Sequence, residues 1–257
     1  MSRWTDFRNK GYLWFHRLKR ADDTFDFHGI DVYAPESVGL TARYKIFRGR
    51  YERQEVEAIR NYLSGDFDVI ELGGSIGAVS ALVSSTLWGR RCTSREPVRH
   101  VVVEANPLLI PVLEKNLISS EVRSRIITSA ISYSSTNGFV DFWYTADDNL
   151  VGSIQSPDAR ATCHSVPAVR LSDILFQEKI NDYSLICDIE GGELELFTED
   201  TVALGRCQLA IVELHPAILA RQGASTETIT GAAAKAGLSK IDQFDDVYVF
   251  RRIGGSR

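Results

Sequence analysis

From Phe67 onward, short apolar runs alternate along the chain with segments of helical spacing, and this alternation constrains the fold more than any other feature. The runs that we expect to be core strands are Asp68–Leu72, His100–Glu104, Arg125–Ile131, Ser184–Ile189 and Gln208–Leu214. Apolar strands separated by helices are typical of a parallel sheet with helices on both faces. The sequence therefore predicts an α/β fold around a mostly parallel sheet.

Helices are expected between these strands, where apolar residues recur at helical spacing. They are Gly77–Trp88, Pro107–Leu117, Glu193–Glu199 and Pro216–Gln222, with Gln54–Leu63 ahead of the first strand. Asn106 followed by Pro107 is typical of an N-cap with proline at the first helical position. We therefore expect a helix to begin at Pro107.

Two further pairs of strands are expected beside this series. Lys240–Phe244 and Val247–Phe250 flank a short acidic turn and predict a closing antiparallel hairpin. Val140–Tyr144 and Val166–Leu171 predict an added hairpin or edge strands ahead of the fourth core strand. A series of parallel strands closed by an antiparallel hairpin narrows the architecture considerably.

The chain has 257 residues, and no repeat or Pro/Gly-rich linker divides it. We therefore expect one domain over residues 51–257 and an N-terminal extension over residues 1–50. Within the extension, Asp26–Tyr33 predicts strand structure. The first 20 residues interleave basic and aromatic side chains, which is typical of an arm that packs its aromatic stripe on its own domain.

Composition excludes several classes of partner and location. Lys and Arg total 29 against 34 Asp and Glu, a net charge of −5, which argues against a nucleic acid as the main partner. No stretch approaches the ~20 apolar residues needed to span a bilayer, and the start lacks the apolar run of a signal peptide. The four cysteines form no CxxC pair, which argues against a small disulfide scaffold and against a zinc knuckle. We expect a cytoplasmic protein without a transmembrane segment; its oligomeric state stays open, a homodimer being one option.

A glycine-rich turn follows the first core strand in the sequence Glu-Leu-Gly-Gly-Ser-Ile-Gly. A dinucleotide fingerprint would need glycine where Ser75 and Ala78 stand, and the Gly-Lys-Ser/Thr of a phosphate loop is absent. What remains, acidic-x-Gly-x-x-x-Gly, is the first motif of S-adenosylmethionine (SAM) dependent methyltransferases. The expected cofactor-binding residues of this turn are Glu71, Gly73, Gly74, Ser75 and Gly77. The alternative is that the turn needs glycine only for tight packing.

Glu104 stands at the tip of the second core strand. A carboxylate at this position of a nucleoside-binding α/β fold accepts hydrogen bonds from both ribose hydroxyls, because it offers two acceptor oxygens. Ala105 and Asn106 follow it directly, and Ala130 lies near the end of the third strand. We expect all of these residues, with Asp188, to contact the cofactor.

Ionisable residues also mark the ends of the fourth and fifth core strands. Asp188 and Glu190 follow one strand and His215 the other, so that all three face one cleft in a parallel sheet. The alternative is structural: Glu193 and Glu195 favour the start of the next helix, and His215 is a satisfied histidine at a strand end.

Together these segments resemble the FkbM-type SAM-dependent methyltransferases over about Tyr51 to Phe250. The resemblance rests on Glu71–Gly77, Glu104–Pro107, Asp188–Glu193 and Glu213–Pro216. It implies a Rossmann-like class I methyltransferase sheet with an antiparallel C-terminal strand, and methyl transfer to a hydroxyl of a sugar, glycan or secondary metabolite. Family members commonly read Asp-x-Gly-Ala-Asn-x-Gly, so Glu71, Gly74 and Ser75 indicate a changed geometry around the cofactor or substrate.

Methyl transfer from a sulfonium to a hydroxyl is an in-line displacement that requires positioning and a group to accept the proton. Asp188 is the expected general base, with Glu190 and His215 as alternates or orienting partners. The acceptor is a small-molecule or glycan hydroxyl. The residues expected on the acceptor side of the cleft are Glu52, Trp143 and Ser153.

Three other functions remain as alternatives. Asp188, Glu190 and His215 have the ligand types of a Mg²⁺ site, which would make the enzyme a metal-assisted sugar O-methyltransferase, although the sequence does not require the metal. An NAD(P)-dependent oxidoreductase is disfavoured by the failed dinucleotide fingerprint. A non-catalytic binding module of the same fold is the third, since fold does not determine function.

Overall fold

The computed structural model describes residues 23–89, 98–118, 124–145, 148–154 and 161–254 of the chain. Within these ranges the strands form a central sheet of seven, a small sheet of four and a hairpin of two. The basic and aromatic arm expected over the first 20 residues lies outside the described residues. No helix in the described part is both long enough and apolar enough to cross a membrane.

The central sheet runs in the order β12-β13-β11-β10-β3-β4-β5. Its strands are β3 (Asp68–Leu72), β4 (His100–Glu104), β5 (Ser124–Thr128), β10 (Tyr183–Cys187), β11 (Cys207–Glu213), β12 (Leu238–Phe244) and β13 (Val247–Arg252). Pairing is parallel from β11 through β5, and β13 is antiparallel to both of its neighbours. The predicted Rossmann-like sheet with an antiparallel C-terminal strand is confirmed.

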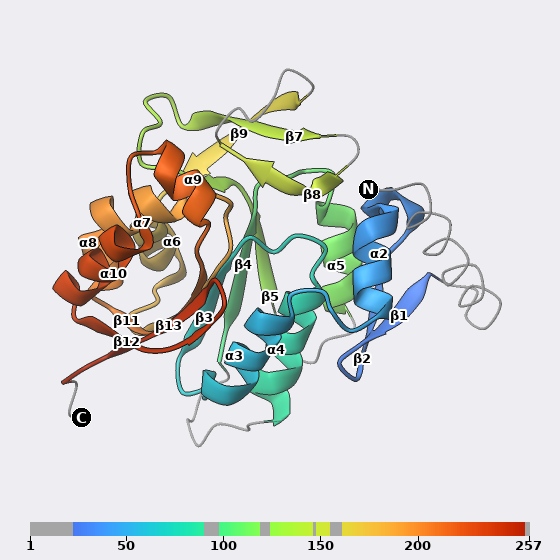
Figure 1. Ribbon diagram of the computed structural model, residues 1–257, viewed down its shortest axis with the longest axis horizontal. Helices are drawn as coiled ribbons and strands as arrows, with labels where there is room; N and C mark the ends of the chain where they lie inside the picture. Colours follow the sequence, from blue (N-terminus) through green and yellow to red (C-terminus); the bar gives the residue numbers. More distant parts are fainter. Residues whose placement is uncertain (1–22, 90–97, 119–123, 146–147, 155–160, 255–257) are drawn as a thin grey trace.

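Helices cover both faces of this sheet (Figure 1). On one face lie α3 (Arg53–Tyr62), α4 (Ala78–Gly89) and α5 (Ile110–Ile118); on the other lie α6 (Leu171–Glu178), α7 (Glu193–Glu199), α8 (Thr201–Leu204) and α10 (Thr226–Lys235). Side chains alternate between the two cores along each strand, as the pleat requires. Val69 and Ile186 belong to the first core, and Ile70 and Leu185 belong to the second.

The strand order reverses between β3 and β10, because the chain proceeds from β3 to β4 on one side and later fills β10 and β11 on the other. Open α/β sheets bind ligands in the crevice beyond the carboxyl ends of the strands at such a switch point. The small sheet borders this end of the molecule (Figure 1). It has the order β6-β9-β7-β8, with β6 (Ala130–Ile131), β7 (Phe139–Thr145), β8 (Asp148–Ser153) and β9 (Thr162–Val169).

The described part of the N-terminal extension shares the core of the α3–α5 face. The expected strand structure over Asp26–Tyr33 is a hairpin of β1 (Thr24–Phe27) and β2 (Ile30–Tyr33), which α2 (Leu40–Phe47) follows after a short 3-10 turn. Asn116 of α5 ties the hairpin down, because its side chain accepts from the Tyr33 amide (2.7 Å) and donates to the Tyr33 carbonyl (2.9 Å).

Three predicted elements were wrong by more than a shift of one or two residues at an end. The expected strand Arg125–Ile131 is split at Ser129, so that β5 joins the central sheet and β6 pairs with β9 in the small sheet. The expected helix Pro107–Leu117 begins only at Ile110, because Asn106 caps a separate turn whose Leu108 amide donates to Asn106 Oδ1 (3.1 Å). The expected edge strand Val166–Leu171 ends at Val169, and Leu171 opens α6.

The turn after β3 passes unusually close to the end of β10. The Asp188 amide donates to the Leu72 carbonyl (2.9 Å), and Gly73 has φ = 92°. A Cβ placed on Gly73 would lie 1.8 Å from the Asp188 carbonyl oxygen. Glycine is therefore required at this position for two reasons: the backbone has a positive φ, and the backbone at Asp188 lies too close to leave room for a side chain.

Replacing Gly73 with alanine is expected to lower the free energy of unfolding by roughly 1–3 kcal/mol, because the added methyl overlaps a main-chain oxygen at positive φ. Gly231→Ala is the matched control, since a Cβ in this part of α10 meets nothing within 4 Å. We expect the control to be neutral or up to about 1 kcal/mol more stable. Urea unfolding measures both; equal stability of the two variants would contradict the proposed constraint.

Candidate active site

A cavity opens at the switch point, where the carboxyl ends of β3, β4 and β10 meet. Its walls come from the glycine turn, the ends of β4 and β10, helices α2 and α3, and the small sheet. Gly73, Gly74 and Ser75 line it in the middle, with Glu104 at one end and Asp188 at the other. The cavity thus joins most of the residues that the sequence predicted for a cofactor.

Glu104 is fixed at its end of the cavity by two backbone donors. The Ser75 amide donates to Oε2 and the Asn106 amide to Oε1, each at 2.6 Å. Burial raises the pKa of Glu104, and the amides of Asn106 and Ser75 oppose that rise. Each carboxylate oxygen has a second lone pair, so the group can still accept from a diol. Ala105, Asn106 and Ala130 line the same end.

Two predicted cofactor residues are not among the residues that line the cavity. Gly77 closes the turn by donating its amide to the Gly74 carbonyl (2.8 Å), and a Cβ there would press on Leu113 of α5. Glu71 is buried beneath the turn. It accepts from Ser80 Oγ of α4 (2.6 Å), and its Oε2 lies 2.8 Å from Nε2 of His100 on β4.

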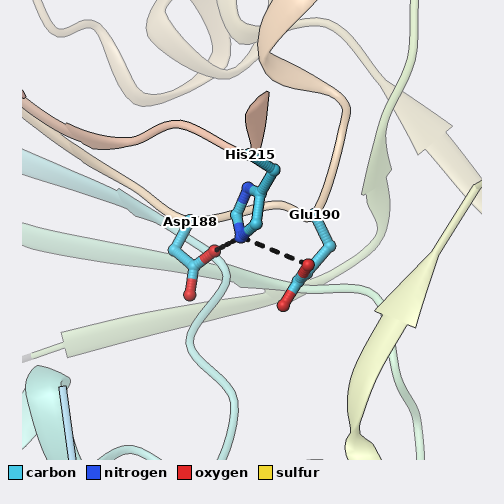
Figure 2. Close-up of side chains that lie close together, drawn as sticks. All are labelled: Asp188, Glu190 and His215. Atoms are coloured by element: carbon cyan, nitrogen blue, oxygen red, sulfur yellow. Dashed lines mark ion pairs between the residues drawn. The ribbon is translucent and has the colours of Figure 1, made fainter. Parts of the chain in front are cut away.

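At the other end of the cavity the lining residues Asp188 and Glu190 are acidic, and His215, which is not itself a lining residue, lies beside them (Figure 2). Nε2 of His215, at the start of α9 (Pro216–Arg221), lies 3.2 Å from Glu190 Oε2 and 3.6 Å from Asp188 Oδ1. Its Nδ1 lies 3.5 Å from Glu193 Oε1. Glu193 is itself held by the amides of Ile189 (3.1 Å) and Gly191 (2.8 Å). The structure therefore brings together the three predicted catalytic residues.

Charge in this cluster shifts several pKa values. Burial lowers the pKa of His215, but the carboxylates of Glu193, Glu190 and Asp188 outweigh burial and raise it to about 10. Burial and the neighbouring charges of Glu213, Glu190 and Glu52 hold the pKa of Asp188 well above its ordinary value. At neutral pH, His215 is thus a cation beside the carboxyl group of Asp188, which gains a proton more readily than an ordinary aspartate.

The predicted acceptor-side residues lie in different positions. Glu52, the N-cap of α3, lines the cavity, and burial and the charge of Glu213 raise its pKa to about 7. Ser153 donates its hydroxyl to the Glu190 carbonyl (2.8 Å) and so supports the acidic end. Trp143 is not among the lining residues; Phe142, on the opposite face of β7, takes that place and packs against Gly152.

Sequence reasoning missed Glu55. This side chain lies on the buried face of α3, lines the cavity and is only 4% exposed. Burial and the charges of Asp188, Glu52, Glu71 and Glu213 hold its pKa well above the ordinary value. The signal was present in the predicted helix Gln54–Leu63, where Glu55 falls at helical spacing with the apolar Ala58 and Ile59.

Among the described residues, two groups have the donors and proximity to hold a metal ion. They are Asp188, Glu190 and His215, and Glu52, Asp188 and Glu213; in each, one ligand atom per residue lies within 4.8 Å of the others. Glu213 stands at the end of β11, and burial raises its pKa. Oxygen-rich groups of this kind suit Mg²⁺ or Mn²⁺.

Replacing Glu71 with alanine is expected to lower the free energy of unfolding by about 3 kcal/mol or more, because it leaves Nε2 of His100 and Oγ of Ser80 buried without the carboxylate that they contact. Exposed Glu57 on α3 supplies the control, and Glu57→Ala should change stability by less than about 0.5 kcal/mol. Denaturant unfolding of both variants tests the assignment. A Glu71→Ala protein of unaltered stability would show that the residue does not support the fold.

Comparison with known proteins identifies the family. The model of the methyltransferase FkbM domain matches residues 78–252, more than half of the chain. No curated protein sequence matches.

Solved structures with similar folds include a methyltransferase from Pyrococcus furiosus, 11% identical, with 95% of this chain and 98% of that one covered at a TM-score of 0.48. Another is magnesium protoporphyrin IX methyltransferase from Synechocystis PCC 6803, with bound SAH. It is 10% identical, the match covers 93% of this chain and 94% of that one, and the TM-score is 0.46. A third is an O-methyltransferase family protein from Burkholderia thailandensis. It is 12% identical, the match covers 98% of this chain and 72% of that one, and the TM-score is 0.45. The family assignment rests on the domain match alone: this chain belongs to the FkbM methyltransferase family.

Proposed function

We propose that this methyltransferase transfers the methyl group of SAM to a hydroxyl of a small molecule, such as a sugar, glycan or secondary metabolite, with Asp188 as the general base. The observation that carries the proposal is the continuity of one cavity. It runs from Glu104 past the glycine turn to Asp188, so a nucleoside at one end and a proton acceptor at the other share one space.

The Glu104 end suits the nucleoside. Its carboxylate is pre-positioned by the amides of Ser75 and Asn106, and a diol that donates to it needs no rearrangement of the chain. Gly73 and Gly74 present only backbone to the cavity, which lets a ligand approach closely. A cofactor laid along this wall would direct its sulfonium toward the acidic end.

The acidic end suits the transfer itself. The acceptor oxygen attacks the methyl carbon in line with the carbon–sulfur bond, the carbon–oxygen bond forms, and the carbon–sulfur bond breaks with its electron pair passing to sulfur. The hydroxyl proton passes to the Asp188 carboxylate, and S-adenosylhomocysteine leaves uncharged at sulfur. A raised pKa makes Asp188 a stronger proton acceptor in its ionised form.

His215 and Glu190 are assigned to positioning. Nε2 of His215 lies between the carboxylates of Asp188 and Glu190, and Nδ1 faces Glu193, which two backbone amides hold in place. An imidazolium at this point keeps Asp188 oriented and favours its ionised form.

A second candidate is the same transfer assisted by a divalent cation. The grouping of Asp188, Glu190 and His215 within ligand distance favours it. Activity that is lost in EDTA and restored by Mg²⁺ would support this version of the reaction.

Isothermal titration calorimetry with SAM and, separately, with NADPH tests the cofactor. We expect saturable binding of SAM and none of NADPH, because the glycine turn lacks the second and third glycines of a dinucleotide fingerprint. Binding of the nicotinamide cofactor alone would contradict the proposal and favour an oxidoreductase.

Two substitutions separate the roles of the two ends. Glu104→Ala should weaken SAM binding by at least roughly tenfold, because two hydrogen bonds to a charged acceptor are lost. Asp188→Asn should abolish turnover and leave SAM affinity within about threefold, since the proton acceptor is removed while the nucleoside wall is unchanged.

Turnover is followed by mass spectrometry as the gain of a labelled methyl group in cell extract incubated with SAM that carries the label. Glu57→Gln, exposed on α3, serves as the control and should match the unaltered enzyme in both measurements. A tenfold loss of SAM affinity in Asp188→Asn with normal affinity in Glu104→Ala would reverse the assigned roles.

A further inference from the structure

Three carboxylates from separate elements converge at the acidic end of the site, and two of them, Glu52 and Asp188, line the cavity. Glu52 comes from the start of α3, Asp188 from the turn after β10 and Glu213 from the end of β11. One oxygen of each lies within 4.8 Å of the others. Three ionised carboxylates at this spacing repel one another, and a positive charge between them would relieve the repulsion.

The basic side chains of the site lie beyond ion-pair distance from two of these three carboxylates. His215 lies 3.6 Å from Asp188 and 3.2 Å from Glu190, whereas its charge acts on Glu213 and Glu52 from further away. In the described part of the chain, no basic nitrogen forms an ion pair within 4.0 Å of Glu52 or Glu213. Lys45 of α2 lines the cavity but is exposed and acts on these two carboxylates only from a greater distance.

Glu55 provides a second, independent observation. The residue is 4% exposed and lines the same cavity, and its carboxyl has no hydrogen-bond partner among the described residues. Burial raises its pKa, and the charges of Asp188, Glu52 and Glu213 add to that rise, so Glu55 lies close enough for the same three carboxylates to act on it. A buried polar group without a partner is costly, and a ligand of positive charge at this point would remove that cost.

We propose that Glu52, Asp188 and Glu213 bind one divalent cation, Mg²⁺ or Mn²⁺, with Glu55 beside it. Carboxylate oxygens are the ligands that these ions prefer, and the site differs from the group formed by Asp188, Glu190 and His215. In that group the His215 imidazole lies within 3.6 Å of the Asp188 and Glu190 carboxylates, whereas no basic nitrogen of the described residues lies within 4.0 Å of Glu52 or Glu213.

The cation also narrows the class of acceptor. Mg²⁺ requires octahedral coordination and commonly keeps several waters, so three carboxylate oxygens leave positions for acceptor oxygens. An acceptor with two adjacent oxygens, as in a sugar diol, fits such a site best because it displaces two waters at once. The role of the cation in binding the acceptor rests on the proposed methyl transfer to a hydroxyl. The binding of the cation by the three carboxylates does not depend on that proposal.

Electron paramagnetic resonance of Mn²⁺ added to chelator-treated protein tests the site directly, because bound Mn²⁺ leaves the free-ion signal. We expect one saturable site per chain, from which Mg²⁺ displaces Mn²⁺. Glu52→Gln and Glu213→Gln should each weaken Mn²⁺ binding by at least roughly tenfold, whereas the exposed control Glu57→Gln should not change it.

Thermal unfolding separates ligation from a structural role. Without metal, Glu213→Gln should be as stable as the unaltered chain or more stable, because it relieves repulsion; with Mg²⁺, only the unaltered chain should gain stability. A Glu213→Gln protein that is destabilised equally with and without Mg²⁺ would overturn the proposal.

Two further outcomes also decide the question. Absence of saturable Mn²⁺ binding overturns the cation site, and SAM binding in the same samples would leave the proposed function intact. Mn²⁺ binding without SAM binding supports the site while the proposed function fails. Loss of Mn²⁺ binding in His215→Gln, with normal binding in Glu52→Gln, would move the ion to the other group and overturn the assignment.

Discussion

The close approach between the turn after β3 and the end of β10 is the constraint on which the rest of the site depends. Gly73 passes so near the Asp188 carbonyl that no side chain fits between them. The Asp188 amide is bonded to Leu72, so the two strand ends are fixed relative to each other. Asp188 therefore stands beside the glycine turn because the backbones leave it no other position.

The same turn fixes the opposite end of the cavity. The Ser75 amide donates to Glu104, and the buried group of Glu71, Ser80 and His100 joins β3, α4 and β4 beneath it. Glu104 and Asp188 are thus positioned through one short segment. A change in this segment is expected to move both ends together, which links the stability of the sheet to the geometry of the site.

Electrostatics explains why the two ends differ. At Glu104, backbone amides oppose the cost of burying one carboxylate. At the other end, burial and the charges of neighbouring carboxylates raise the pKa values of Glu52 and Asp188, and the one histidine that they share opposes the rise only in part. An excess of negative charge in a partly closed cavity attracts cations, and both a sulfonium and a divalent ion have the required sign.

The sequence predicted the central sheet well because its strands are buried on both faces and appear as continuous apolar runs. It failed where that signal is absent. Strand β8 (Asp148–Ser153) has little apolar alternation, and the alanine-rich α10 buries only Ile229 and Ala233. Ser129 divides one apolar run between two sheets, which only the three-dimensional pairing reveals.

The candidate site was predictable to the extent that it follows strand ends. Glu104, Asp188 and His215 each stand at or just after the carboxyl end of a strand, and the structure places them around one cavity or its acidic end. Glu55 was missed because it lies within a helix, where an acidic residue on the buried face is read as solvent-facing. Trp143 was expected at the cavity, but Phe142 on the other face of β7 lines it, since alternation alone does not say which face is turned inward.

The most direct test of the account is a crystal structure of the chain with S-adenosylhomocysteine. We expect the ribose hydroxyls to donate to Glu104 and the sulfur to face the end of the cavity formed by Asp188. A nucleoside bound away from Glu104, or a sulfur directed away from Asp188, would contradict it.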